Sequence, residues 1–453
     1  MNDLKMKIYN HSPIHIQNLL TSLAGYWITK SRYSRVYYAF LKELERMDFT
    51  NAAAEQKHQE VELQQLIRHA VQNSSFYQKF YKGIDIESIK TLEDLKKLPI
   101  LEPETARQNI ESMYTIRESA AVVSYTSGTS GTPLKFLFTK EDHQKRMAFL
   151  DFFKKQHGVV NLQMKRASIS AQHFIPKNQQ KKVFWRDNHS SRQRLYSAYY
   201  CTEKSAQEVI ENFELYRPDF IDGLPSAIYE LAKWINQRKI TLSFRPIAIF
   251  TTAETLYPLW KKEIEEAFGC PVRNQYATPE GSPFITECPK GNLHYNMRSG
   301  IIETTDEGNM IVTGFNTYGT PIIRYNIGDR LEFPRVAKRC ECGSAHPVLE
   351  EVQGWSDDFL QAKCKRKISP FYFSMASGHL ANAIKKMQFI QNSLEAIDVL
   401  IEGDVNYTNS MTEVVHEQME YVFGTDMVFN IRIVEQIPIQ PNGKFKLVIN
   451  NIT

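Results

Sequence analysis

The sequence has no long hydrophobic run and no strong excess of charge of either sign. A stretch of about 18 apolar residues is missing, and the start of the chain lacks the basic, apolar and small-residue pattern of a secretory leader. Neither a membrane span nor export is therefore expected. The 55 Lys and Arg residues nearly balance the 51 Asp and Glu residues, which leaves a formal charge of +4. A charge this small on 453 residues gives no support for nucleic-acid binding.

Cysteine is also scarce. Six cysteines are scattered along the chain, too few for a disulfide scaffold, so a reducing, cytoplasmic setting is expected. The remaining composition, 42% hydrophobic and 23% charged, is typical of globular proteins. The length is sufficient for a large core and for more than one domain.

The N-terminal part of the chain has apolar residues at helical spacing. Residues 12–48 and 53–81 each predict helices, which we expect to form a packing layer. Residues 26–40 combine aromatic and basic side chains, so a peripheral membrane contact is the alternative interpretation of that segment.

Strands and helices alternate after residue 121, with one strand predicted at 270–276, and this pattern predicts parallel α/β layering. Residues 299–333 contain short β-rich segments separated by turns and predict a small β subdomain. A break near 354–358 precedes a tail of mixed strands and helices. The predicted fold is therefore α/β: a helical layer (1–90), a large domain with parallel sheets and a β subdomain (91–354), and a small C-terminal α/β lid (355–453).

The most informative segment is a loop rich in hydroxyl groups and glycine, which ends in a lysine. Such a loop suits phosphate binding, because glycine allows close approach of backbone N–H groups and the hydroxyls add donors without bulk. It is not a Walker-type loop, since it lacks the G-x-x-x-x-G-K-[ST] spacing. An ordinary surface loop is the alternative. The segment comprises Thr126, Ser127, Gly128, Thr129, Ser130, Gly131, Thr132, Pro133, Leu134 and Lys135.

Three further motifs follow predicted strands, where α/β folds place ligand contacts. They are Thr252-Ala253-Glu254, Gln275-Tyr276-Ala277-Thr278-Pro279-Glu280-Gly281, and Asn326-Ile327-Gly328-Asp329. In them Tyr276 could stack on a purine, Glu280 could ligate Mg²⁺, and Asp329 could accept from ribose hydroxyls. A fourth motif near the chain end, Pro441-Asn442-Gly443-Lys444-Phe445-Lys446, joins a turn to two lysines. Taken singly, each of these residues has an ordinary structural alternative.

In this order and at these separations, the motifs resemble the adenylate-forming superfamily of acyl- and aryl-CoA ligases. Within it the chain is similar to the phenylacetate–CoA ligase-like branch. The stretches 184–188 and 216–227, together with the aromatic N-terminal helices, resemble the subgroup associated with capsular polysaccharide biosynthesis. The resemblance extends from about residue 10 to the end of the chain.

The resemblance implies a role for each motif. Thr126 to Lys135 would hold the triphosphate of ATP, Ala253, Glu254, Ala277 and Thr278 would line the nucleotide pocket, and Tyr276 would pack on the adenine. Glu280 would bind Mg²⁺ and Asp329 the ribose. Asp357 would be the hinge of the lid. Lys444 would reach the reacting carboxylate during adenylation, with Lys446 as its competitor.

Two departures from the family pattern stand out. Trp355 occupies the hinge position where an arginine is usual. The subgroup often carries a histidine in a Ser-Ser-Tyr-His stretch, where this chain has Ser197-Ala198-Tyr199-Tyr200. Phe184, Trp185, Tyr199, Tyr200 and Phe220 predict either an aromatic acid pocket or plain core.

A metal site is predicted from Cys288, His294, Cys340 and Cys342, because three sulfurs and one imidazole suit tetrahedral structural Zn²⁺. His346 could replace His294, and reduced buried cysteines are the alternative. The resemblance allows such a zinc.

These features predict a ligase that activates a carboxylic acid as acyl-AMP with Mg²⁺ and ATP and transfers it to an acceptor. Coenzyme A is the family default. A carrier protein or a sugar hydroxyl or amine is the alternative acceptor in polysaccharide biosynthesis. A nucleotide-binding scaffold that has lost catalysis is the competing hypothesis, suggested by Trp355.

Overall fold

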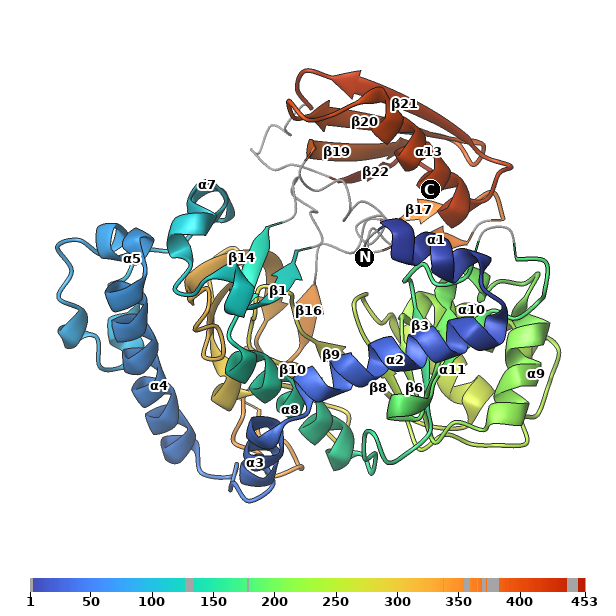
Figure 1. Ribbon diagram of the computed structural model, residues 1–453. Coiled ribbons are helices and arrows are strands. Elements are labelled where there is room, and N and C mark those ends of the chain that lie inside the picture. Colours follow the sequence, from blue (N-terminus) through green and yellow to red (C-terminus); the bar gives the residue numbers. More distant parts are fainter. Residues whose placement is uncertain are drawn as a thin grey trace.

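The computed structural model describes residues 3–126, 134–176, 179–336, 338–353, 359–364, 366–368, 372, 383–437 and 447–452. Figure 1 shows the N-terminal helices along one side and the front, two groups of sheets behind them, and the C-terminal sheet above. The mixture of parallel and antiparallel sheets with helices confirms the predicted α/β class.

The N-terminal helices are shorter than the periodicity predicts. Ser74 divides the second predicted helix, since its side chain accepts the N–H of Tyr77 and caps a new helix there. The helices are α1 (Asp3–His11), α2 (Ile14–Arg32), α3 (Arg35–Leu44), α4 (Ala52–Asn73), α5 (Ser75–Phe80), α6 (Leu92–Leu95) and α7 (Pro103–Met113), with single turns at Ile86–Ser88 and Glu118–Ala120.

A six-stranded sheet in the order β4-β5-β3-β6-β7-β8 forms the main α/β layer. All of its neighbouring strands are parallel except β4 and β5. The strands are β3 (Arg166–Ser170), β4 (Trp185–Asn188), β5 (Gln193–Ser197), β6 (Phe220–Gly223), β7 (Ile249–Thr251) and β8 (Val272–Arg273). The helices are α8 (Lys140–Gln156), α9 (Ala206–Tyr216), α10 (Pro225–Gln237) and α11 (Pro258–Phe268), with turns at His189–Ser191 and Ala198–Tyr200.

Two four-stranded antiparallel sheets and a hairpin form the β part. The sheets have the orders β15-β11-β10-β9 and β12-β13-β14-β16, and β1 pairs with β2. The strands are β1 (Val122–Tyr125), β2 (Lys135–Phe138), β9 (Gln275–Tyr276), β10 (Ile285–Glu287), β11 (Leu293–Tyr295), β12 (Gly300–Thr304), β13 (Asn309–Gly314), β14 (Ile322–Glu332), β15 (Val348–Leu349) and β16 (Glu351–Gln353), with a turn at Met297–Ser299.

The single strand predicted at 270–276 is divided between two sheets. β8 joins the six-stranded sheet, whereas β9 pairs with β10. The chain changes sheets at Asn274, where the buried carboxylate of Glu287 accepts the Asn274 N–H at 3.1 Å and the Glu287 N–H donates to the Asn274 carbonyl at 2.9 Å. Those two bonds hold the backbone across the sheet boundary.

The C-terminal part forms a sheet of its own in the order β21-β20-β19-β22. Its elements are β17 (Leu360–Gln361), β18 (Lys367–Ile368), β19 (Ile384–Gln391), β20 (Ala396–Gly403), α13 (Asn409–Phe423), β21 (Val428–Val434) and β22 (Val448–Asn450). Tyr421 of α13 contacts the large domain, with ring centroids 4.6 Å from Tyr199 and 4.4 Å from His173. The expected hinge at Asp357 lies outside the described residues, so the domain boundaries remain predictions.

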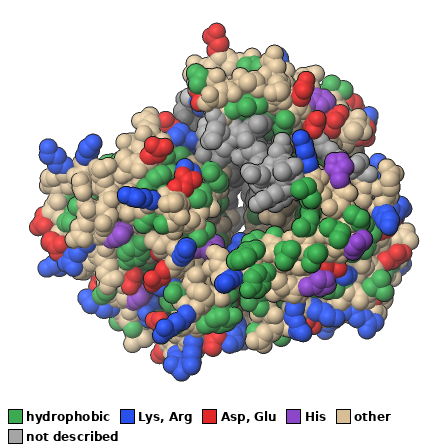
Figure 2. Space-filling model, in the orientation of Figure 1, with side chains coloured by type: hydrophobic (Ala, Val, Ile, Leu, Met, Phe, Trp, Pro, Cys, Tyr) green, Lys and Arg blue, Asp and Glu red, His purple; other side chains and the backbone are tan. Residues whose placement is uncertain are grey.

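The surface mixes both signs of charge. Figure 2 shows Lys and Arg side chains interspersed with Asp and Glu on the visible face, as the small net charge leads one to expect. Among the described helices, none has the length and apolar content required to cross a bilayer.

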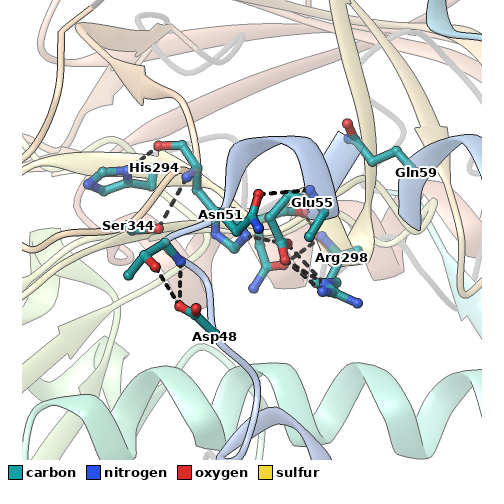
Figure 3. A network of polar contacts seen from close by, with 12 residues as sticks. Asp48, Asn51, Glu55, Gln59, His294, Arg298 and Ser344 are labelled. Carbon is teal, nitrogen blue, oxygen red and sulfur yellow. Dashed lines mark hydrogen bonds and ion pairs between the residues drawn. The ribbon is translucent and has the colours of Figure 1, made fainter. Parts of the chain in front are cut away.

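A buried ion-pair network fastens α4 to the β part of the molecule (Figure 3). Glu55 of α4 is fully buried and accepts two hydrogen bonds from Arg298 Nε and Nη2, the shortest at 2.6 Å. His346 Nε2 lies 3.0 Å from the same carboxylate. Although burial alone would raise the pKa of Glu55, the hydrogen bonds from His346 and Arg298 lower it.

We expect Arg298→Met to destabilise the fold by about 3 kcal/mol or more, because it leaves the Glu55 carboxylate buried without its main partner. Urea unfolding of the two proteins measures the difference. Arg68→Met is the matched control, since Arg68 pairs with Glu87 on the exposed surface and its loss should change stability little. Equal effects of the two substitutions would contradict the assigned role of the network.

Candidate active site

The motifs predicted from the sequence meet around one large cavity. Its volume is about 1230 Å³, and it lies beyond the carboxyl ends of β7 and β9. Its lining includes seven predicted site residues: Ala253, Glu254, Tyr276, Ala277, Thr278, Glu280 and Asp329. These residues come from three separate segments of the chain, so the fold brings together what the sequence keeps apart.

The segment after β7 has an unusual backbone. Ala253 has a φ of 69°, in the left-handed region that non-glycine residues rarely adopt. The backbone around it is held on both sides: Thr252 N–H donates to the Gly223 carbonyl at 3.0 Å, and Glu254 Oε2 accepts the Ser226 N–H at 3.1 Å. Ser226 lies in the first turn of α10, where a carboxylate is favoured by the helix dipole. This arrangement directs residues 253–254 into the cavity.

Tyr276 and Asp329 meet across the cavity. The Tyr276 hydroxyl donates to Asp329 Oδ2 at 2.5 Å, and the two residues come from β9 and β14 in different sheets. Burial and the adjoining carboxylate of Asp329 raise the pKa of Tyr276 well above its usual value. The phenol therefore stays protonated, and the hydrogen bond fixes both side chains.

Glu280 occupies an electrostatically unfavourable place for a carboxylate. It lines the cavity, and burial, opposed by hydrogen bonds from its own backbone and Thr278, raises its pKa to about 7. Gly281 follows with a φ of 100°, and a Cβ there would lie 2.5 Å from Thr317 Cγ2. Only glycine fits this close approach, which explains the Glu280-Gly281 pair.

A buried arginine supports this segment from α8. Arg146 is 6% exposed and donates to the carbonyls of Ser282 at 3.1 Å and Thr278 at 3.4 Å. Its guanidinium also lies 4.5 Å from the centroid of Phe284. Burial lowers the pKa of Arg146 to about 10, so it remains a cation at neutral pH. Arg146 therefore supplies positive charge beside Glu280.

The two described ends of the Ser/Gly loop differ in their surroundings. Thr126 closes the β1–β2 hairpin: its Oγ1 accepts the Leu134 N–H at 2.9 Å and its N–H donates to the Leu134 carbonyl at 3.0 Å. Lys135 pairs with Glu118 at 2.7 Å, and that hydrogen bond raises its pKa. In this arrangement its ammonium group is directed to Glu118, and Lys135 does not line the described cavity.

The other predicted site residues fall outside the described part of the chain. They are Ser127, Gly128, Thr129, Ser130, Gly131, Thr132, Asp357 and Lys444. Trp355 and Lys446 also lie outside it. Their roles remain predictions from the sequence.

The predicted metal ligands converge. The ligand atoms of Cys288, His294, Cys340 and Cys342 all lie within 4.8 Å of one another. Cys288 Sγ is 3.7 Å from Cys340 Sγ, and Cys342 Sγ is 3.6 Å from His294 Nε2. Zinc–sulfur bonds of about 2.3 Å at tetrahedral angles place two sulfurs about 3.8 Å apart, so the cluster has the dimensions of a structural zinc site.

The surroundings of the cluster support metal binding. His294 (Figure 3) donates from Nδ1 to the His346 carbonyl at 2.8 Å. Its Nε2 therefore remains for the cluster, where it lies 3.6 Å from Cys342 Sγ. Burial alone would raise the pKa of the Cys340 thiol, but hydrogen bonds from Cys342 N–H and His294 lower it to about 6. His346, the alternative ligand, instead uses its Nε2 on Glu55.

A known protein matches this chain over nearly its whole length. The sequence is 35% identical over 452 residues to Protein CapK of Staphylococcus aureus, and the match covers 98% of this chain and 99% of that protein. The chain belongs to the CapK family. Residues 360–451 also match the family model of the CapK C-terminal domain.

The fold of this CapK-family chain is that of adenylate-forming ligases. The crystal structure of 2-hydroxyisobutyryl-CoA ligase in complex with 2-HIB-AMP and CoA in its thioesterification state superposes with a TM-score of 0.58. A postadenylation-state structure of the same ligase gives 0.57. Each comparison covers 89% of this chain and 91% of the other, at 17% identity.

The part of the cavity lining that comes from helices α2 and α8 was not predicted from the sequence. Trp27, Ile28, Ser31 and Arg32 of α2 and His143, Arg146, Met147 and Leu150 of α8 complete the cavity lining in the CapK-family chain. The α8 residues have helical spacing, so one shared face could have been predicted, but nothing in the sequence shows that this face meets a cavity.

The aromatic acid pocket suggested by the sequence does not form at the expected residues. Phe184, Trp185, Tyr199 and Tyr200 pack in or against the main hydrophobic core, and Phe220 in a smaller cluster. None of the five lines the described cavity. The structure therefore supports the plain-core alternative for them.

Glu280→Gln is expected to stabilise the ligand-free protein. The pKa of Glu280 is raised to about 7 in the fold, so the stability linked to its proton is present below the unfolded value of about 4.5 and lost as pH rises through about 7. The gain from Gln should grow between about pH 5 and pH 8 and reach on the order of 1 kcal/mol, discounted because the side chain faces cavity water.

Thermal melts across this pH range measure the gain. Glu332→Gln is the matched control, because Glu332 lines the same cavity but is exposed to solvent. A Glu280→Gln protein whose stability relative to wild type is independent of pH would show that the carboxyl is not buried as described.

Proposed function

We propose that this protein activates a carboxylic acid with ATP, forming an acyl-AMP and releasing pyrophosphate, and then transfers the acyl group to an acceptor. The observation that carries the proposal is the meeting of Tyr276, Glu280, Asp329 and the 253–254 segment around one cavity. Family membership and the ligase fold support it.

In this proposal the nucleotide lies along the carboxyl ends of β7 and β9. Tyr276 packs on the adenine, and its hydroxyl donates to Asp329 Oδ2. Asp329 accepts from ribose hydroxyls in the proposal. Because the pair is already joined, little side-chain freedom is lost when the nucleotide binds.

In the proposal, the negative charge of the phosphates is neutralised by Mg²⁺ at Glu280 and by donors of the loop 126–135. Glu280 would hold Mg²⁺, for which a carboxylate oxygen is a suitable ligand, and the bound ion would neutralise charge on the phosphate oxygens. Cation binding also offsets the unfavourable burial of the Glu280 carboxylate. The loop 126–135 donates to the triphosphate in the proposal.

The acid carboxylate attacks the α-phosphate, a phosphate–oxygen bond forms, and the bond to pyrophosphate breaks. Lys444 stabilises charge on the reacting oxygens, and a lid rotating at Asp357 then exchanges Lys444 for the acceptor. Coenzyme A, a carrier protein, and a sugar hydroxyl or amine are the acceptor classes. Resemblance to the capsular polysaccharide subgroup favours a role in surface polysaccharide biosynthesis.

Lys444→Ala should lower acid-dependent ATP–pyrophosphate exchange at least a hundredfold, roughly 3 kcal/mol, because a charge that acts in the transition state is removed. Lys446→Ala is the matched control, two residues away, and should retain most of the exchange. The acid is first found by trapping acyl-AMP with hydroxylamine across an acid library.

The outcomes separate the hypotheses. Full exchange by Lys444→Ala with loss in Lys446→Ala would transfer the role to Lys446. Retention by both would contradict the proposed adenylation chemistry. ATP binding without exchange for any acid would favour the scaffold hypothesis.

We further propose that Cys288, His294, Cys340 and Cys342 hold a structural Zn²⁺. The four-ligand set would leave no open coordination position, so the ion would act on the fold and not on the substrate. It would join the turn after β10 to the loop before β15. The loop before β15 also contains His346, which contacts Glu55 of α4, so the ion would help to hold α4 against the β part of the molecule.

Protein purified without chelator should contain about one equivalent of zinc, and Cys340→Ser should contain much less and melt at a lower temperature. Elemental analysis and thermal melts give the two readings. Cys364→Ser is the matched control, because Cys364 is exposed and outside the cluster. Zinc far below one equivalent in the wild-type protein would refute the site.

A further inference from the structure

Helix α2 exposes much of its apolar surface to solvent and buries polar and small residues against the protein. Its two buried residues are Gln17 and Gly25, whereas five of its large apolar residues are exposed: Leu19, Leu23, Tyr26, Trp27 and Ile28. Gln17 is 3% exposed, whereas Leu19, Leu23 and Trp27 are 54%, 51% and 64% exposed. A surface helix normally shows the opposite arrangement, because burial of the apolar face stabilises it.

Hydrogen bonds explain how the polar face is held. Gln17 Oε1 accepts from Arg186 Nε at 2.6 Å, and Asn18 Oδ1 accepts the Asp187 N–H at 3.1 Å. Ser22 Oγ donates to the Asp187 carbonyl at 3.3 Å. The helix is thus fastened to β4 by specific polar contacts, and its orientation is fixed.

The helix also lies very close to its support. A Cβ on Gly25 would lie 2.2 Å from Asn188 Oδ1, so a larger residue would push the helix away. With the inner face so tightly fitted, the outer residues have no route into the core. The apolar face remains available to a partner.

The outward residues form a continuous band along α2. It consists of Leu19, Leu23, Tyr26 and Trp27, and Lys30 lies over the Trp27 ring at 5.6 Å. Figure 2 shows hydrophobic side chains gathered over the position of α2 in Figure 1. An apolar band of this kind on a protein surface marks an interaction site.

We propose that the α2 band docks the protein on an anionic lipid bilayer, with α2 lying in the plane of the interface. Charge complementarity supports a bilayer over a protein partner: residues 14–32 contain no Asp or Glu, and the exposed cations Lys30 and Arg35 lie near the end that carries Tyr26 and Trp27. Aromatic residues beside cations suit the headgroup region.

The band continues into the cavity. Trp27 and Ile28 belong to the exposed surface of α2 and also line the cavity, together with Arg32. Docking through α2 therefore places the cavity entrance beside the bilayer. An acid or acceptor carried on a lipid reaches the cavity along α2 in this arrangement. The docking itself does not depend on the proposed adenylation chemistry.

Vesicle sedimentation of the full-length protein tests the docking. The wild type should bind vesicles of phosphatidylcholine mixed with phosphatidylglycerol, and should bind phosphatidylcholine vesicles more weakly. Leu19→Gln with Leu23→Gln should weaken binding to the mixed vesicles by roughly tenfold or more, since two exposed leucines lose their apolar contact.

Leu215→Gln with Leu259→Gln is the matched control, because both leucines are exposed on other helices, at 82% and 59%. This control should bind as the wild type does. Trp27 fluorescence should be quenched by lipids brominated on their acyl chains, and the quenching should decrease in Trp27→Phe protein. Circular dichroism verifies that each variant is folded.

Three outcomes would overturn the proposal. They are no binding of the wild type to mixed vesicles, equal loss in the control pair, and a wild-type dimer that the Leu19 and Leu23 substitutions dissociate without any vesicle binding. The last result would assign the band to a second copy of the chain, and analytical ultracentrifugation detects it.

Discussion

The hydrogen bond between Tyr276 and Asp329 is the constraint on which the cavity depends. Its two residues belong to β9 and β14, which lie in different sheets, so the bond fixes how these sheets approach each other at the cavity. Arg146 of α8 holds the segment that follows β9, because its guanidinium donates to the carbonyls of Thr278 and Ser282. The cavity is therefore shaped before any ligand binds, and its preformed geometry lowers the entropic cost of binding.

The segment after β9 also contains the least favourable charge of the site, the Glu280 carboxylate. Glu280 is a carboxylate that burial disfavours, although Arg146 lies near enough to offset part of the cost. A protein without a use for this carboxylate would be more stable with a neutral residue in its place. Local instability of this kind fits a position that binds a cation only when substrate arrives.

The strand-end residues could be predicted from the sequence because a general physical rule applies to them. Carboxyl ends of parallel strands meet at one edge of a sheet, so the position of Ala253 and Glu254 after β7 follows from the sequence. Tyr276 and Asp329 were also expected at strand ends, but they lie within β9 and β14 of antiparallel sheets. The division of 270–276 between two sheets could not be predicted, because it depends on Glu287, a distant residue, binding Asn274. The direction of α2 was equally hidden, since its apolar periodicity is the same whether the apolar face points inward or outward.

The aromatic contacts of Tyr421 bear on how the C-terminal part can move. Tyr421 meets Tyr199 and His173, and it also interacts with Tyr200, the tyrosine that stands where the subgroup often carries histidine. The segment containing Lys444 is bounded by Ile437 and Leu447, both buried, and β22 pairs with β19 immediately after it. The proposed lid rotation would carry this sheet with it and act against the Tyr421 contacts. Aromatic pairs contribute about 0.5–1.5 kcal/mol each beyond burial, so these contacts would oppose the proposed rotation by an energy of that order.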